Sequence, residues 1–244
     1  MISMTYILAG SGALFVTGAL LFLLGTFRLP AACRPYGYAA TVACGGMGVA
    51  YLIMVPVELA GMETDFTRFA GYSVVWIAIC FVVGAVANAG RRLTLALLGV
   101  VLARLWITYA SWSVDGAVGL FLTLSTFAAL FVGVYLLFGP FMRAIETISG
   151  ERALLYSKLR NLVVLAWVGL VVAGLLNGVG ITDDFVGLFL GIYVEAILLL
   201  GFGGILIRSV DALEDTAETD PLLPFDIGPL ESDSDPDADI SAAD

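Results

Sequence analysis

The stretch YVEAILLLGFGGILIRS, residues 193–209, decides the fold of this 244-residue chain. It is an apolar run that ends at Arg208 and carries one acidic residue, Glu195, in its first half. A run of this kind, about 20 residues long, is sufficient to cross a bilayer as an α-helix. An acid within such a helix is costly unless it is paired or hydrated, so Glu195 is the first candidate for a functional residue.

The composition extends this reading to the whole chain. Hydrophobic residues make up 60% of the sequence, charged residues make up 13%, and the mean hydropathy is +1.01, which is typical of an integral membrane protein. We therefore predict an all-α, multi-pass protein of the cell membrane, with the lipid bilayer as its surroundings and residues 1–210 as its transmembrane domain. The predicted membrane-spanning helices cover residues 5–27, 37–57, 69–90, 93–113, 117–139, 160–180 and 185–208.

The distribution of basic residues predicts the orientation. Loops on one side of the membrane carry most of the arginines and the single lysine, whereas Arg68 is the only basic residue near the opposite, mainly acidic loops. Because basic loops stay in the cytoplasm, we expect the N-terminus outside and the C-terminus in the cytoplasm. The basic residues on the predicted inner side are Arg28, Arg34, Arg91, Arg92, Arg143, Arg152, Lys158, Arg160 and Arg208.

Residues 211–244 differ in character from the rest of the chain. They contain 12 acidic residues and no basic residue, so they account for the formal net charge of -10. Such a segment buries too little apolar surface to fold alone, and we predict a disordered cytoplasmic tail. The stretch PLLPFDIGPL at 221–230 is an alternative, because its apolar residues could dock on a partner.

Few charges fall within the predicted membrane helices. Arg68 lies at the outer start of the third helix, from where its long side chain can reach Glu195 and form an ion pair; the alternative is a protonated Glu195. Arg104 has no acid three or four residues away on its own helix. It could face a water-filled cavity, a lipid phosphate or a neighbouring subunit, with a structural or an anion-binding role.

Other classes of function find no support in the sequence. The chain contains no histidine, its three cysteines lack metal-ligand spacing, and no acid and base couple is visible, so we predict neither an enzyme nor a metal site. Phosphate-binding loops and basic nucleic-acid patches are also missing from the pattern.

Several stretches resemble one known family. YLLFGPF at 135–141, YSKLRNLVVLAW at 156–167 and GFGGILIRS at 201–209 look like helix ends of the haloarchaeal microbial rhodopsins, the bacteriorhodopsin-like proteins. TRFAGYSVVW at 67–76 and AYLIM at 50–54 look like parts of the third and second helices of that family. The resemblance implies a seven-helix bundle of microbial-rhodopsin type and a homo-oligomer such as a trimer.

The same resemblance implies that this chain is a divergent member. The seventh helix of the family carries an acid and, four residues later, the lysine that binds retinal as a Schiff base; here these positions are Glu195 and Leu199. The counterion position in the third helix is Gly71. The only lysine, Lys158, is predicted far from the pocket, so we expect no covalent retinal and no bound cofactor.

The resemblance also places a remnant of the chromophore pocket. Packed side chains are expected to fill it, because empty cavities destabilise; if it is open, it would suit a non-covalent isoprenoid, carotenoid or lipid tail. Beside it, Tyr51, Arg68 and Glu195 would form a polar network, either a structural clamp or a pH-responsive site. The residues of the remnant pocket are Tyr72, Val75, Thr123, Leu130, Trp167, Leu170 and Gly174.

These observations together predict a rhodopsin-like membrane protein without covalent retinal that is not a light-driven pump. The role expected from the sequence is a light-independent sensor, scaffold or regulatory interaction protein with a cytoplasmic or membrane protein partner. The alternative is a passive ion channel or a protein that binds an isoprenoid, carotenoid or lipid without a covalent bond.

Overall fold

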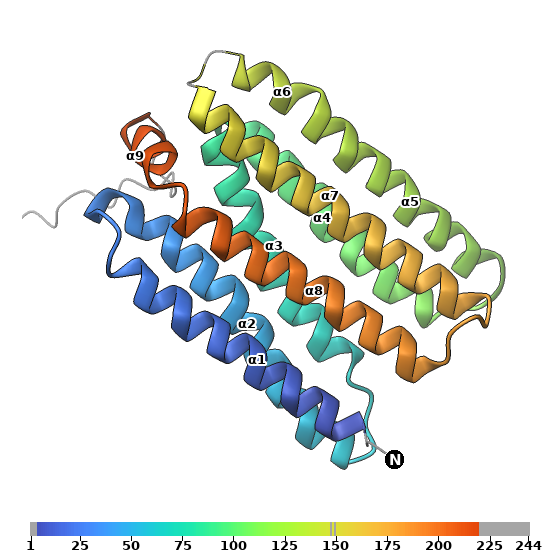
Figure 1. Cartoon of the computed structure of the whole chain (residues 1–244). Helices are drawn as coiled ribbons and strands as arrows, with labels where there is room; N and C mark the ends of the chain where they lie inside the picture. Colours follow the sequence, from blue (N-terminus) through green and yellow to red (C-terminus); the bar gives the residue numbers. More distant parts are fainter. Residues whose placement is uncertain (1–3, 147, 149, 220–244) are drawn as a thin grey trace, which may run out of the picture.

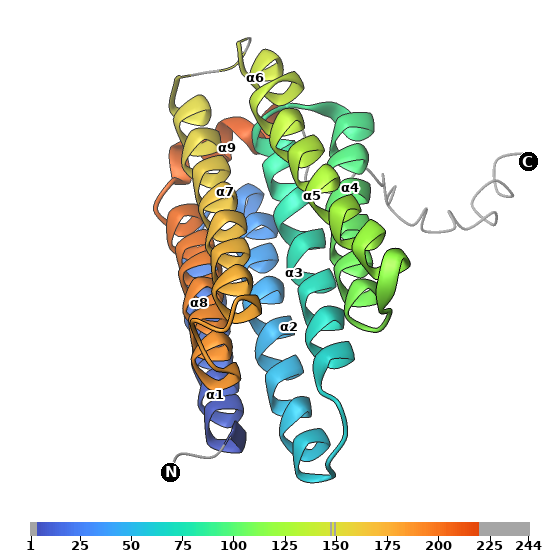
Figure 2. The ribbon, with the colours of Figure 1, turned by 90° about the vertical axis from the view of Figure 1, so that its right-hand side faces the viewer.

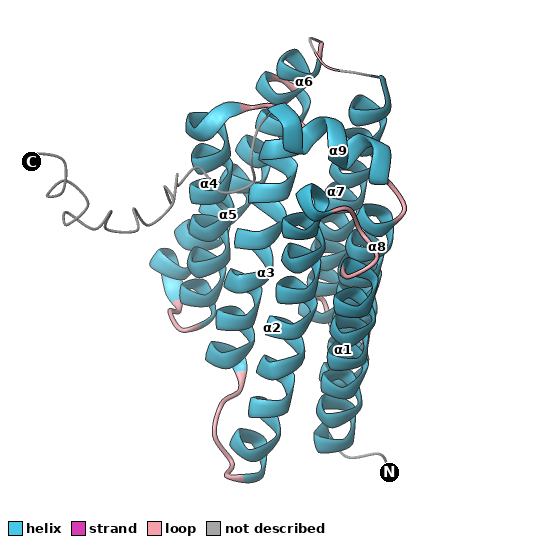
Figure 3. Cartoon of the chain, turned by 90° about the vertical axis from the view of Figure 1, so that its left-hand side faces the viewer, coloured by secondary structure: helices cyan, strands magenta, loops and turns pink. Residues whose placement is uncertain are grey.

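The computed structural model describes residues 4–146, 148 and 150–219 of the chain, and this part is helical throughout, with short connecting loops (Figures 1 and 3). Its elements are α1 (Met4–Thr26), η1 (Ala31–Cys33), α2 (Arg34–Leu59), α3 (Asp65–Val86), α4 (Gly90–Trp112), α5 (Gly116–Phe138), α6 (Pro140–Ile145), α7 (Gly150–Gly178), α8 (Asp184–Ile207) and α9 (Val210–Thr219).

Seven of the helices in the described part are long and apolar enough to cross a membrane, which confirms the predicted all-α, multi-pass architecture. Most boundaries lie within a few residues of the prediction. The largest difference is at α7, which begins at Gly150 although its apolar run was predicted to begin at 160. The reason is that its first turns are amphipathic: Leu155 and Tyr156 are buried there, while the charged Lys158 is exposed. Hydropathy detects the membrane-crossing part of a helix but not such an extension.

The bundle has a tight half and a loose half. Helices α1, α2, α3 and α8 pack closely, whereas α5 packs mainly on α4 at the side of the bundle away from α1 (Figures 1 and 2). Small residues allow the close approach: a Cβ on Gly48 of α2 would lie 2.9 Å from the backbone nitrogen of Val16 on α1. Only three residues of α5 are buried, namely Gly119, Gly133 and Leu137.

Residues 211–219, predicted from the sequence as the start of the acidic tail, lie in the helix α9 (Figure 3). Ala212, Leu213 and Thr216 are buried where α9 packs on η1 and on the ends of neighbouring helices, while the acidic residues are more exposed. This amphipathic spacing stabilises a helix that net charge alone would not predict. The stretch 221–230 lies outside the described residues.

A buried arginine joins the start of α7 to the end of α3. Arg152 is 1% exposed, and its Nε and Nη2 atoms donate hydrogen bonds of 2.8 Å to the carbonyl oxygens of Val86 and Ala85. The carbonyls at a helix C-terminus lack partners within the helix, and a cation is favourable there. Arg152 therefore caps α3, a role that its position in a basic loop did not reveal.

Gly84 of α3 tests the close packing of α3 and α4. A Cβ at this position would meet the side chain of Thr94, with 2.9 Å to its Cβ, whereas a Cβ on Gly99 of α4 would meet nothing within 4 Å. Overpacking costs about 1–3 kcal/mol, and alanine regains about 0.8–1 kcal/mol of helix propensity. We expect Gly84→Ala to lower the free energy of unfolding by about 1 kcal/mol.

The measurement is the thermal midpoint in detergent by circular dichroism, with Gly99→Ala as the matched control. We expect the midpoint of the control to stay equal to that of the wild type or to rise slightly. Equal midpoints for the two variants would contradict the packing described for α3 and α4.

Candidate functional site

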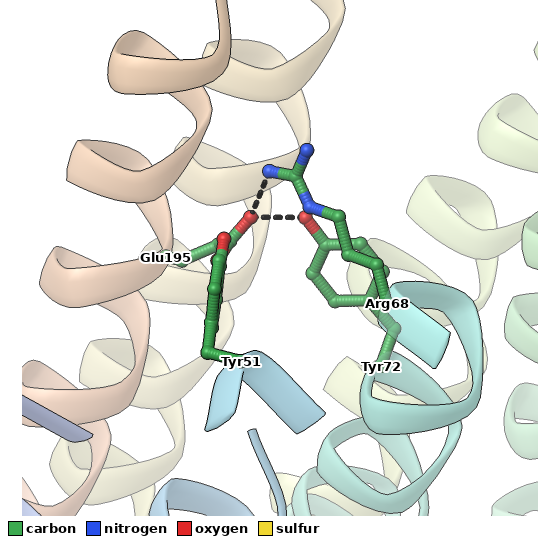
Figure 4. A network of polar contacts seen from close by, with 4 residues as sticks. All are labelled: Tyr51, Arg68, Tyr72 and Glu195. Atoms are coloured by element: carbon green, nitrogen blue, oxygen red, sulfur yellow. Dashed lines mark hydrogen bonds and ion pairs between the residues drawn. The ribbon is translucent and has the colours of Figure 1, made fainter. Parts of the chain in front are cut away.

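A buried carboxylate forms the centre of the site. Glu195 of α8 is 2% exposed and accepts hydrogen bonds from three side chains on two other helices (Figure 4). The Tyr51 hydroxyl donates to Oε2 at 2.6 Å, the Arg68 Nη2 donates to Oε1 at 2.5 Å, and the Tyr72 hydroxyl also donates to Oε1. We call Tyr51, Arg68, Tyr72 and Glu195 the Glu195 network.

Local structure explains how these side chains meet. Arg68 and Tyr72 are four residues apart on α3 and therefore lie on one face of that helix, whereas Tyr51 comes from the second half of α2. Gly191 lies one turn before Glu195 on α8, where a Cβ would be 2.9 Å from the Arg68 Nη2 atom. The guanidinium thus occupies space that a larger residue at 191 would fill.

The charges of the network balance each other. Arg68 and Glu195 form the one salt bridge found within the described part of the chain. The Arg68 side chain is 16% exposed and the Glu195 side chain is 2% exposed, so both partners are largely shielded from solvent. A buried pair of this kind is stable only when hydrogen bonds satisfy the remaining polar atoms, and the two tyrosines provide them for the carboxylate. The position of the Arg68 guanidinium beside the Glu195 carboxylate is that of an ion pair, and Glu195 is not an acid without a charged partner.

A cavity of about 480 Å³ lies beside the network, between α3, α4, α5, α7 and α8. Arg68 and Tyr72 belong to its wall as well as to the network. The expectation that packed side chains fill the remnant pocket is therefore wrong. Phe131 of α5 is 70% exposed and is not among the cavity-lining residues. Five residues of the predicted pocket line the cavity, namely Tyr72, Thr123, Leu130, Leu170 and Gly174.

The other two residues predicted for the pocket lie outside the cavity wall. Val75 and Trp167 are each 1% exposed and pack in the core, where the Trp167 ring lies 5.6 Å from that of Trp76. Trp76 does line the cavity, although it was not predicted to do so. A residue-by-residue resemblance assigns a residue to a position along a helix. The rotation of that helix about its axis decides whether the side chain faces the cavity or the core.

Leu199 and Gly71, the positions matched to the family lysine and counterion, are not among the cavity-lining residues. Leu199 is 2% exposed within the core, one turn after Glu195 on α8. Gly71 faces α2, because a Cβ on it would lie 2.6 Å from the Cβ of Ala50. Lys158, the only lysine, is exposed near the opposite end of α7.

Arg104 is brought to the cavity from α4. Its guanidinium carbon lies 5.8 Å from the centre of the Trp167 ring, and its Nε is buried without a hydrogen-bond partner. No ion pair or hydrogen bond of this guanidinium is found within the described residues. The wall of the cavity thus carries two arginines, of which one is paired with a carboxylate.

Tyr72 is the network member that the sequence did not predict. The resemblance assigned it to the pocket only, although its spacing from Arg68 could have indicated that both reach the same acid. The network places two phenol donors and a fixed positive charge around one carboxylate. Among the described residues, no group of three or more His, Cys, Asp or Glu side chains is placed to hold a metal ion.

No family model and no curated protein sequence matches the chain, but solved structures do. The thermophilic rhodopsin from Rubrobacter xylanophilus aligns with a TM-score of 0.79 over 88% of this chain and 99% of that chain, at 18% identity. The chain has the fold of the microbial rhodopsins. The light-driven proton pump of Coccomyxa subellipsoidea aligns at 0.72 over 85% and 98%, with 18% identity, and that of Leptosphaeria maculans at 0.77 over 88% and 98%, with 11% identity.

This comparison corrects two expectations drawn from the sequence. The solved structures that share the fold are rhodopsins and light-driven proton pumps. This finding contradicts the expectation of a light-independent sensor, scaffold or regulatory protein and its channel or ligand-carrier alternative. The expectation of a protein without cofactor is wrong for the same reason.

Removal of the central acid tests the energetics of the network. Glu195→Leu leaves the Arg68 guanidinium without its salt-bridge partner, and we expect the free energy of unfolding to fall by about 3–5 kcal/mol. The double variant Arg68→Leu with Glu195→Leu removes both charges, so we expect it to recover at least half of this loss.

Chemical unfolding in mixed micelles measures these changes, with Glu63→Leu, at an exposed loop position, as the control. If the double variant is less stable than Glu195→Leu alone, the two side chains do not act as a pair.

Proposed function

We propose that the chain is a microbial rhodopsin of the pump-like kind, which binds a retinal-class polyene in the cavity and moves protons across the membrane in the light. One observation carries this proposal: Arg68 and Tyr72 form part of the cavity wall and also donate hydrogen bonds to Glu195. The size of the bound group and the hydrogen-bond state of a buried acid are therefore linked through two side chains. The fold shared with light-driven proton pumps supports the same class.

The cavity fits a polyene in size and lining. Its volume of about 480 Å³ lies within the range of about 300–1,000 Å³ that is typical of small-molecule pockets. Trp76, Phe127 and Leu130 provide apolar contact surfaces, and Gly174 leaves room on α7, where a Cβ would meet nothing within 4 Å. Since Leu199 has no amine, contacts with these walls have to hold the group. A retinal-class polyene, when bound, supplies light absorption and a change of shape on isomerisation.

The chain's own residues supply the proton chemistry. The Glu195 carboxylate accepts hydrogen bonds from three donors, Tyr51, Arg68 and Tyr72. Tyr51 is 0% exposed and packs on Phe15 with 5.7 Å between ring centres, so it is the fixed donor. Arg68 and Tyr72 face the cavity and are the donors that a change of cavity shape would displace. Such a displacement would remove hydrogen-bond donors from the Glu195 carboxylate.

The finer features expected from the sequence belong to this proposal. We place the N-terminus outside and the C-terminus in the cytoplasm, on the strength of the basic inner loops. The acidic residues 211–244, the single lysine and the quoted motifs support a haloarchaeal member of the family. The exposed apolar faces suit the bilayer and a homo-oligomer, and no enzymatic activity is proposed.

The test of the proposal is reconstitution with all-trans retinal. We expect a visible or near-ultraviolet absorption band that co-purifies with the protein, and a light-dependent change of external pH in vesicles that a protonophore abolishes. Glu195→Gln keeps the shape of the side chain but removes the charge, so we expect it to retain the band and lose most of the pH change. Retinal that fails to co-purify would overturn the proposed function.

A second test concerns the position matched to the family lysine. Leu199→Lys places an amine one turn from Glu195 on the same face of α8, so we expect an adduct with retinal that borohydride reduces, in contrast to the wild type. We do not combine this substitution with Gly71→Asp at the position matched to the family counterion, because Ala50 leaves no space for an aspartate side chain. Arg208→Lys, which adds an amine at the exposed end of α8, is the control and should give no adduct. An unmodified Leu199→Lys protein would show that this residue lies out of reach of the cavity.

A further inference from the structure

Unpaired hydrogen-bond donors are concentrated at the cavity. Four buried side-chain nitrogen or oxygen atoms in the described part of the chain have no hydrogen-bond partner, and two of them are the Nε atoms of Arg68 and Arg104. Both arginines line the cavity. Arg68 is already neutralised by Glu195, whereas the charge of Arg104 has no acid partner within the described residues. The cavity therefore lacks a negative charge to balance Arg104 and hydrogen-bond acceptors for the two Nε atoms.

We infer that Arg104 forms a carboxylate-binding site in the cavity, so that the polyene favoured there ends in a carboxylate and not in an aldehyde or an alcohol. This inference rests on the proposed function, since it names the chemical class of the group that the same cavity holds. The carboxylate would lie at Arg104 on α4, and the apolar chain would extend between Trp76, Phe127 and Leu170.

The donor geometry favours a carboxylate over other polar ends. A guanidinium has five N–H donors and no acceptor, so a ligand ammonium finds no partner there and is repelled by the uncompensated charge of Arg104. The Nε and one Nη of an arginine lie side by side and match the two oxygens of a carboxylate. An aldehyde or alcohol oxygen accepts fewer hydrogen bonds and leaves the charge of Arg104 uncompensated within the bilayer.

The surroundings of Arg104 favour an apolar chain attached to that carboxylate. The guanidinium carbon lies over the Trp167 ring, which stabilises the cation from one side and leaves its edge for a ligand. The hydroxyls of Thr108, Thr123 and Thr126 already donate hydrogen bonds to backbone carbonyls. Their hydrogens are therefore not available to bind an anion, and Arg104 does not compete with them as its donor. A small inorganic anion would balance the charge but would leave the apolar wall without contacts.

The experiment compares three polyenes of equal length on the full chain in an uncharged detergent. Retinoate, retinal and retinol are titrated separately, and binding is followed by the quenching of tryptophan fluorescence, because Trp76 and Trp112 line the cavity. We expect retinoate to bind about 10- to 100-fold more tightly than retinal or retinol, the range given by charge-assisted hydrogen bonds.

The matched variants are Arg104→Gln and Arg208→Gln, the latter at an exposed position outside the cavity. Arg104→Gln should remove the preference for retinoate and leave the affinity for retinal within about 2- to 3-fold of the wild type, because the apolar contacts persist. Arg208→Gln should keep the preference. If Arg104→Gln does not fold, Arg104→Lys replaces it and should keep the charge but lose most of the preference, since it cannot bind in a bidentate manner.

The outcomes separate the inference from the proposed function. Equal affinities of the wild type for retinoate and retinal, or a preference that survives Arg104→Gln, would overturn the inference and leave the proposed function standing. Complete displacement of retinoate by chloride at submillimolar concentration would assign the site to an inorganic anion and would also overturn the inference. Failure of all three polyenes to bind would overturn both.

Discussion

The buried carboxylate of Glu195 is the constraint on which the site depends. It accepts hydrogen bonds from α2 and α3, two neighbouring helices that lie far from α8 in the sequence. Because a carboxylate within a membrane is costly without its donors, the three helices are held in one relative register. The positions of Arg68 and Tyr72 follow from that register, and with them one wall of the cavity.

The two halves of the bundle contribute differently to stability and to binding. Around Glu195, glycines such as Gly48 and Gly191 allow helices and side chains to approach closely, and the core there is continuous. On the other side, α5 rests mainly on α4 and buries little of its own surface. A cavity costs stability, and this one lies at the boundary where α3 and α8 of the tight half meet α4, α5 and α7. Arg152 adds a fixed point by capping α3 from α7.

The sequence predicted the features that depend on one helix at a time. Seven helices and their approximate limits follow from apolar length, and a meeting of Arg68 with Glu195 follows from the cost of buried charge. The features that were missed depend on how helices rotate against one another. Tyr72 was assigned to the pocket but also bonds to Glu195, Gly71 faces Ala50, and Val75 lies outside the cavity. The amphipathic helix α9 was hidden by its acidic composition, and the functional expectation gave one missing amine more weight than the preserved fold.

The sparse packing of α5 has a consequence for how the cavity is reached. Its outward side chains, such as Phe121 and Tyr135, are 68% and 63% exposed on a helix that is long and apolar enough to cross a membrane. Because α5 packs on α4 and hardly contacts α7, we expect a hydrophobic ligand of the proposed kind to enter sideways from the acyl chains and not across the aqueous face. Exchange of such a molecule would follow its partitioning into lipid and the fluidity of the surrounding acyl chains, and not its dissolved concentration.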